Sequence, residues 1–271
     1  ISFYGMQKMR KQLLLLIVVG MVLVITGCSS VPYTNRSRYL AYSQSEENEL
    51  GKTAWEEIKK EEKISTDSEK NAMLARVVKK LIPVSGMADL DWEYLVFESE
   101  TENAFALPGG KIAFYSGIFK YFNSDDELAV VAAHEIAHVI ARHSNEGMSQ
   151  QNIANIAGVA SVLTAYILTD GDTAATAVTG AVAYGGLNYG FLLPYSRTHE
   201  AEADEIGIVL MAKAGFDVDV AVPFWQKFGN DSTISFFSTH PSSADRIENI
   251  KRVISELKSG THTSGVVIRA K

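Results

Sequence analysis

The chain has 271 residues, of which 46% are hydrophobic, and its 32 acidic and 25 basic side chains give a net charge of −7. This composition supplies enough apolar material for one large or two small domains, and it excludes an intrinsically disordered or collagen-like chain. The acidic balance argues against nucleic acid as a partner, because phosphate contacts need a surplus of Lys and Arg. A single cysteine excludes an internal disulfide and a four-cysteine metal cage.

The first residues have the pattern of an export signal. A basic stretch precedes an apolar run from Leu13 to Ile25, which is short for a membrane-spanning helix. The run ends in Ile-Thr-Gly-Cys at Cys28, and so resembles the lipobox of bacterial lipoproteins. This resemblance implies that residues 1–27 are a signal peptide and that Cys28 becomes the acylated first residue. The alternative is a plain N-terminal anchor with an incidental cysteine.

Acyl chains on Cys28 would hold the mature protein firmly on a bilayer. Ser29 follows the cysteine where Asp could stand, which resembles the outer-membrane sorting pattern of Gram-negative lipoproteins. We therefore expect an outer-membrane lipoprotein that faces the periplasm, or a cell-surface lipoprotein if the cell is Gram-positive. The polar residues 28–44 read as a tether between this anchor and the domain that follows.

Residues 45–258 are expected to form one α+β domain that is mostly helical. A charged amphipathic pattern predicts a helix over residues 46–60. The capping-box sequence Thr-Asp-Ser-Glu at 66–69 opens a second helix, which Pro83 closes. Alternating segments and a Pro-Gly-Gly turn then predict a small sheet with one hairpin. The predicted strands are 92–97, 104–107 and 112–115.

A second capping box at Ser124 opens an apolar helix that runs to about His143. The segments 153–168 and 174–193 are almost free of charge and could be two short membrane helices. Polar Asn155 and the glycines of the second segment favour a buried or surface-packed helical hairpin instead. The last predicted elements are helices over 197–214, 218–228 and 243–258 and a loose polar tail over 259–271.

The sequence His-Glu-Ile-Ala-His at 134–138 lies within this apolar helix. Side chains four residues apart share one helical face, so His134 and His138 can bind one metal ion. Glu135 lies beside the first histidine, where it can accept a proton from the attacking water and pass it to the leaving amine. A structural metal site would satisfy the buried histidines too, but it would not need Glu135. The pattern therefore predicts a catalytic zinc ion.

Such a zinc ion needs a third protein ligand and an open position. Ala141 and Ser144 stand where the metzincin pattern requires Gly and His, so the third ligand must come from later in the chain. Glu200 and Asp204 share a helical face, which lets Glu200 reach the metal while Asp204 hydrogen-bonds a ligand histidine. His199 remains a possible ligand by residue type alone. Four further residues are assigned no ligand role: Glu202 and Glu205 are expected to be solvated, His143 to end its helix, and His262 to lie in the tail.

Three ordered segments, 103–110, 134–138 and 196–204, resemble the HtpX-like and CAAX-prenyl-protease family of zinc metallopeptidases. With the lipobox, the chain is most similar to its periplasmic lipoprotein branch, the LoiP-like and BepA-like proteins. The resemblance covers about residues 45–257, but the long C-terminal helical-repeat region of BepA-like proteins is lacking. It implies a gluzincin-type zincin fold with a small sheet, and endopeptidase action on misfolded or unassembled envelope proteins. The implied metal ligands are His134, His138 and Glu200, with Glu135 as the base.

Zincins bind substrate as an extra strand along a sheet edge. Residues 104–107 or 112–115 could be that edge, or the hairpin could be purely structural. The residues predicted to contact substrate are Asn103, Ala104, Phe105 and Ala106.

His240 precedes a proline that fixes its backbone, and Arg246 follows in the first turn of the last helix. Relatives in this family show a similar His-Pro segment with an Arg six residues on. We expect His240 beside the open metal position, contacting substrate or transiently the zinc, and Arg246 stabilising the transition state or bracing Glu200. The simpler alternative is that His240 caps the last helix and Arg246 makes a surface ion pair.

The competing function for the whole protein is a lipoprotein chaperone or assembly factor whose metal site is structural or self-inhibited.

Overall fold

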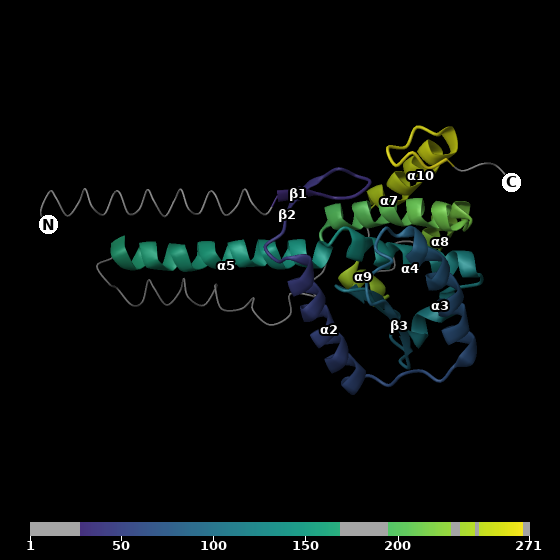
Figure 1. The fold of residues 1–271 in the computed structure, drawn as a ribbon, viewed down its shortest axis with the longest axis horizontal. Helices are drawn as coiled ribbons and strands as arrows, with labels where there is room; N and C mark the ends of the chain where they lie inside the picture. Colours follow the sequence, from purple (N-terminus) through teal and green to yellow (C-terminus); the bar gives the residue numbers. More distant parts are fainter. Residues whose placement is uncertain (1–27, 169–194, 229–233, 242–243, 268–271) are drawn as a thin grey trace, which may run out of the picture.

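A computed structural model describes residues 28–168, 195–228, 234–241 and 244–267 (Figure 1). The predicted signal peptide and the segment 174–193 lie outside the described residues. Within them, the chain is an α+β fold in which helices surround one three-stranded sheet, with a separate two-stranded hairpin at the start. The predicted fold class is confirmed, since helices account for most of the described elements.

The sheet contains β3 (Glu93–Phe97), β4 (Ala104–Leu107) and β5 (Lys111–Tyr115) in the order β3-β5-β4. β3 pairs with β5 in parallel, whereas β4 and β5 form the predicted antiparallel hairpin. Gly109 and Gly110 turn this hairpin with φ angles of +79° and +82°, a region that favours glycine. β4 is thus an edge strand and β5 is central, so only the first of the two candidate edges is free.

Helices cover both faces of the sheet. α2 (Gln44–Glu61) lies on one face, where Trp55 packs against Phe97, Leu107 and Ala113. Gly51 allows this contact, because a Cβ there would lie 2.1 Å from the Pro108 carbonyl oxygen. The other face packs against α3 (Ser68–Leu81), which Asp67 caps, and against α4 (Asp125–Ile140), which Ser124 caps as predicted. The short 3-10 helices η1 (Ile82–Val84) and η2 (Ser116–Tyr121) connect these elements.

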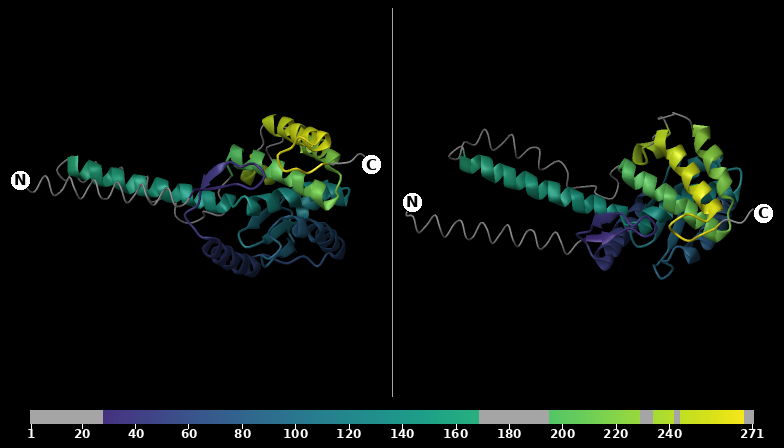
Figure 2. Two further views of the ribbon diagram at one scale, coloured as in Figure 1. Left: turned by 45° about the horizontal axis from the view of Figure 1, so that its top comes forward. Right: turned by 90° about the horizontal axis from the view of Figure 1, so that it is seen from above.

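α4 is buried from Leu128 to Ile140 and ends three residues earlier than predicted. The helical conformation is interrupted at Arg142, whose φ of 53° lies in the left-handed region. A new helix, α5 (His143–Leu168), begins at the next residue. α5 projects from the rest of the fold in all views (Figure 2). Among the described residues, no helix combines the length and apolar character needed to cross a membrane.

α7 (Arg197–Ala214) has the predicted bounds and packs along α4. The two helices approach closely at Gly207, where a Cβ would lie 3.2 Å from the His134 backbone nitrogen. The remaining helices pack around α4 and α7 and complete the main core (Figures 1 and 2). They are η4 (Val218–Val220), α8 (Ala221–Phe228), α9 (Phe236–Thr239) and α10 (Ala244–Ser259).

The predicted tether is wrong for its first part. Residues 28–40 form an N-terminal hairpin of β1 (Cys28–Ser30) and β2 (Ser37–Tyr39). The hairpin is held on the domain because Val31 is buried and Arg36 forms ion pairs with two buried carboxylates.

The C-terminal tail is also less loose than predicted. Gly260 turns the chain back after α10 with a φ of 73°, so that His262 is buried.

Candidate active site

The two histidines of α4 lie where their helical spacing predicts. The Nε2 atoms of His134 and His138 are 3.1 Å apart and point to one position. Both rings are almost completely buried, as is Glu135 between them in sequence. Their helix is held in place by its apolar flanks, so the rings are fixed by the core and not by a surface loop.

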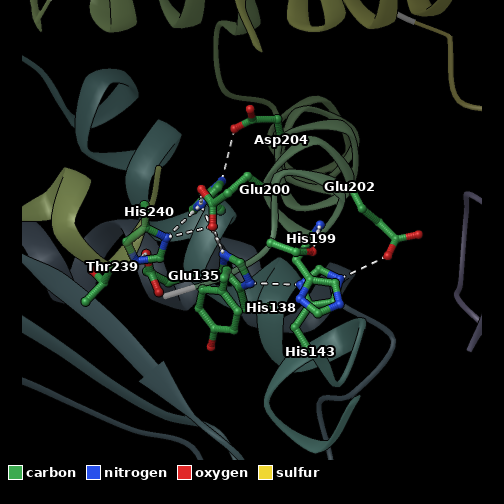
Figure 3. A network of polar contacts seen from close by, with 12 residues as sticks. Glu135, His138, His143, His199, Glu200, Glu202, Asp204, Thr239 and His240 are labelled. Atoms are coloured by element: carbon green, nitrogen blue, oxygen red, sulfur yellow. Dashed lines mark hydrogen bonds and ion pairs between the residues drawn. The ribbon is translucent and has the colours of Figure 1, made fainter. Parts of the chain in front are cut away.

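Glu200 reaches the same position from the first turn of α7 (Figure 3). Its Oε2 lies 3.3 Å from His134 Nε2, and its Oε1 lies 3.5 Å from His138 Nε2. His240, at the end of α9, completes the group, because its Nδ1 is 3.2 Å from Glu200 Oε1 and 3.3 Å from His134 Nε2. One donor atom from each of the four buried residues lies within 4.8 Å of the other three.

This donor set fits a zinc ion. Imidazole nitrogens and a carboxylate oxygen are the ligands that zinc prefers, and a catalytic site uses three of them plus an exchangeable position. Glu200 Oε2 is buried without a hydrogen-bond partner in the described part of the chain, which is costly unless a cation binds there. His134, His138 and Glu200 are thus suited to hold the metal, with His240 at the fourth position.

Asp204 and Arg246 support the ligands from behind. Asp204 Oδ1 lies 3.0 Å from His134 Nδ1, which is the predicted contact to a ligand histidine. Arg246 donates to both Asp204 oxygens, at 2.6 and 2.9 Å, and its guanidinium lies 4.1 Å from the Trp225 ring centroid. Because Arg246 is buried and its Nη1 is 3.5 Å from Glu200 Oε2, the geometry favours the bracing role over a surface ion pair.

Glu135 has no hydrogen-bond partner of normal geometry for either carboxylate oxygen among the described residues. Burial raises its pKa to about 7, although the charges of His240 and Arg246 and the Ala106 peptide N–H act in the opposite direction. His240 Nε2 lies 3.3 Å from Glu135 Oε1. A carboxyl group with a pKa near neutrality can both accept and return a proton, as a general base and acid must.

His138 and Glu200 are already in the protonation states that a metal requires. Burial alone would lower the pKa of His134, but the carboxylates of Glu200 and Asp204 raise it, and a metal would displace the extra proton. Burial and the neighbouring His134 hold the pKa of His138 well below its usual value, so its imidazole is neutral. Burial alone would raise the pKa of Glu200, but His240 and His134 bring it well below its usual value, so the carboxylate is ionised. Neutral imidazole and ionised carboxylate are the metal-binding forms.

The edge strand β4 lies against this site. β4 packs against α4, the helix that carries Glu135, and the Ala106 peptide N–H opposes the rise that burial causes in the pKa of this carboxyl group. Ala104 and Ala106 are buried, whereas Asn103 and Phe105 are partly exposed. Substrate binding along residues 103–106 stays a prediction.

Glu202 is not solvated as predicted, and His143 contacts a metal-site histidine although it was assigned no such contact. Glu202 is 5% exposed and accepts hydrogen bonds from Thr34, Arg36 and His143. His143 is fully buried, with its Nδ1 2.8 Å from His138 Nδ1. The left-handed backbone at Arg142 explains the unexpected position of His143. Helical angles counted from His134 no longer apply beyond Arg142. Burial alone would raise the pKa of Glu202, but its hydrogen bonds to His143 and Arg36 lower it to about 2.

Two stacked rings complete the surroundings of His138 and His143. Tyr195, which no sequence pattern indicated, stacks on His138 with ring centroids 3.9 Å apart. His199 turns away from the metal ligands, as expected from its helical face, and its Nε2 lies 3.3 Å from Glu146 Oε2. Its ring stacks on His143 at 4.4 Å.

Two histidines one turn apart on a buried helix, a glutamate ligand from a second helix and a free glutamate beside the first histidine define a zinc metallopeptidase site. Peptidase family M48 matches residues 68–254, and the chain belongs to this family. It is therefore a zinc metalloendopeptidase with a zincin-like fold, which confirms the predicted enzyme class and cofactor. The predicted relationship is confirmed at the level of this family, whereas the lipoprotein branch stays a prediction.

Curated relatives fall into two groups. The chain is 36% identical to "Mitochondrial metalloendopeptidase OMA1" of Schizosaccharomyces pombe, over 92% of this chain and 73% of that protein. It is 30% identical to the protein of the same name from Saccharomyces cerevisiae, over 90% of this chain and 74% of that protein. A "Putative beta-barrel assembly-enhancing protease" of Vibrio cholerae is also 30% identical, over 79% of this chain but only 46% of that protein.

Proposed function

We propose that the chain is an endopeptidase of the bacterial cell envelope that hydrolyses misfolded or unassembled envelope proteins. The zinc endopeptidase class follows from its family, whereas the location and the substrates are proposals. The lipobox at Cys28 and the similarity to a relative named for β-barrel assembly support the envelope. The relatives named mitochondrial metalloendopeptidases support the same peptidase chemistry in another compartment.

The observation that carries the catalytic proposal is the buried carboxylate of Glu135, next to the ligand group and beside the edge strand β4. A substrate strand paired with residues 103–106 would present its main chain to this carboxylate with little sequence preference. Bound zinc polarises the scissile carbonyl and lowers the pKa of a water molecule. Glu135 accepts the proton of the attacking water and returns it to the leaving nitrogen.

His240 lies between the two buried carboxylates of the site. Its ring reaches both Glu200 and Glu135, so it occupies the position where substrate or water would enter. This position favours a resting form in which His240 limits access to the metal. The same feature supports the alternative function, a lipoprotein chaperone or assembly factor with a self-inhibited site.

Cleavage of an unfolded β-barrel protein by the purified mature chain tests the proposal. Glu135→Gln should keep its zinc and lose at least ~100-fold in hydrolysis, the usual scale of general-base loss. Undiminished hydrolysis would reject Glu135 as the base. Binding without cleavage by both proteins would support the chaperone alternative.

Cell fractionation tests the proposed location. Cys28→Ser should lose palmitate labelling and remain unprocessed or become soluble, while Ser29→Ala should still be labelled. Unchanged membrane association and labelling of the Cys28 variant would show that residues 13–25 are a plain anchor and not part of a lipoprotein signal.

A further inference from the structure

A chain of hydrogen bonds leads from the metal ligand His138 to the N-terminal hairpin. His138 Nδ1 lies 2.8 Å from His143 Nδ1, and His143 Nε2 lies 3.0 Å from Glu202 Oε2 (Figure 3). Arg36, in the turn of the N-terminal hairpin, donates to the same Glu202 oxygen from Nη2 at 2.7 Å and from Nε at 3.0 Å. Three segments far apart in sequence, the hairpin turn, the α4–α5 junction and α7, thus meet behind one ligand.

With both imidazoles neutral, one arrangement of protons makes each contact in this series a hydrogen bond. An ionised Glu202 can only accept, so His143 must donate from Nε2. The Nδ1 of a neutral His143 is then an acceptor, and His138 must donate to it from its own Nδ1. This leaves the Nε2 of His138 with a free lone pair, aimed at His134 Nε2 and Glu200, where the metal binds.

Arg36 holds this arrangement in place. It also donates to both oxygens of Glu146, each at 2.7 Å, so one guanidinium bridges α5 and α7. The side chains of Glu146 and Glu202 are only 6% and 4% exposed, whereas that of Arg36 is 26% exposed. A planar, permanently charged guanidinium can contact two carboxylates in this way, and a lysine ammonium cannot.

We propose that Arg36 is a positioning residue for the zinc ligand His138, acting through Glu202 and His143, so that tight zinc binding depends on the docked N-terminal hairpin. The proposal rests on His138 being a zinc ligand. The hairpin begins at Cys28, the candidate acylation site, and so the segment next to the membrane anchor would be coupled to the metal centre.

Zinc dissociation constants of the mature chain, measured by competition with a chelator, test this proposal without using substrate. His143→Leu should weaken zinc binding by about 10- to 100-fold, as the loss of a ligand's hydrogen-bond partner does. Arg36→Ala acts two partners further away and should weaken zinc binding by roughly 3- to 10-fold, with Arg36→Lys in between wild type and Arg36→Ala. His143→Gln, which can still accept and donate, should retain more affinity than His143→Leu.

Arg38 provides the matched control. It belongs to the same hairpin and is more deeply buried than Arg36, but it donates to Ser29 and to the Ala141 carbonyl oxygen and has no hydrogen bond to Glu202 or His143. Arg38→Ala should change the zinc dissociation constant by less than about 2-fold while it loosens the hairpin. An equal loss of affinity in both Arg variants would overturn the proposal, since hairpin docking in general would then be responsible.

The nitrogen-15 shifts of His138 report its proton directly. The proton should be on Nδ1 in the wild-type protein, and Arg36→Ala and Glu202→Gln should both shift the equilibrium away from that form. If Arg36→Ala does not fold, Arg36→Lys and Glu202→Gln can be compared with the wild type in its place.

Unchanged nitrogen-15 shifts and zinc affinity in these variants would overturn the role of Arg36 but not the zinc site. Full zinc binding by His138→Ala would instead overturn the assignment of His138 as a ligand, on which that role rests.

Discussion

Glu135→Gln should stabilise the metal-free protein, although it abolishes the proposed base. The carboxylate is fully buried and has no hydrogen-bond partner among the described residues. Burial raises its pKa from 4.5 to about 7, so the folded protein resists ionisation of this group. A glutamine amide has similar shape and polarity but carries no charge at any pH.

The size and sign follow from proton linkage. Between pH 4.5 and 7 the folded chain keeps the Glu135 proton that the unfolded chain has lost, so the stability falls as the pH rises through this window. At ~1.4 kcal/mol for each pH unit, the full penalty above pH 7 is about 3 kcal/mol. The glutamine variant lacks this penalty. Its advantage in unfolding free energy should therefore be about zero near pH 4 and about 3 kcal/mol near pH 8.

Denaturant unfolding of both proteins in EDTA, at several pH values, measures this difference. Glu127 in the first turn of the same helix is the matched control. Burial alone would raise its pKa, but the hydrogen bond from Lys227 lowers it, so Glu127→Gln should cost stability at pH 8. The reasoning would be refuted if Glu135→Gln raised the unfolding free energy equally at both ends of the pH range. A lower unfolding free energy of this variant at pH 8 would refute it too.

Three further predictions concern the metal centre. Glu200→Ala should lower zinc content sharply, whereas Glu205→Ala, which loses a surface ion pair with an arginine, should not; atomic emission measures both. Arg246→Ala leaves Asp204 buried without its guanidinium partner, so it should destabilise the protein by about 3–5 kcal/mol in thermal unfolding, and lysine should rescue only part of this. His240→Ala should open the fourth position and raise the rate of zinc exchange, which a chromogenic chelator reports; an unchanged rate would contradict its placement.

Local signals predicted most of the helices and the metal-binding core. The bounds of α7 agree with the sequence analysis because Ser196 caps its start and Gly215 ends it in a left-handed conformation. The spacing of His134 and His138 required only helical geometry, and so did the shared face of Glu200 and Asp204. Each of these features depends on residues within a few turns of one another.

The support behind His138 depends on contacts between distant segments. Arg36 meets Glu146 and Glu202 across 110 and 166 residues of sequence, and no pattern along the chain pairs them. The left-handed backbone at Arg142 then turns His143 toward His138, where a continuous helix would have placed it elsewhere. The sequence therefore suggested a solvated Glu202 and a tether, although Glu202 accepts hydrogen bonds from His143 and from Arg36 of the predicted tether.

Helix α7 supplies a carboxylate to each histidine of α4, and this explains why the two helices must approach so closely. Asp204 contacts His134 directly, and Glu202 acts on His138 through His143. Glu200, between them, reaches the metal position itself. Because Gly207 brings the α7 backbone against α4, a larger spacing would lengthen all these contacts together. The affinity for zinc is therefore a property of the packing between two helices, and not only of the residues that bind the ion.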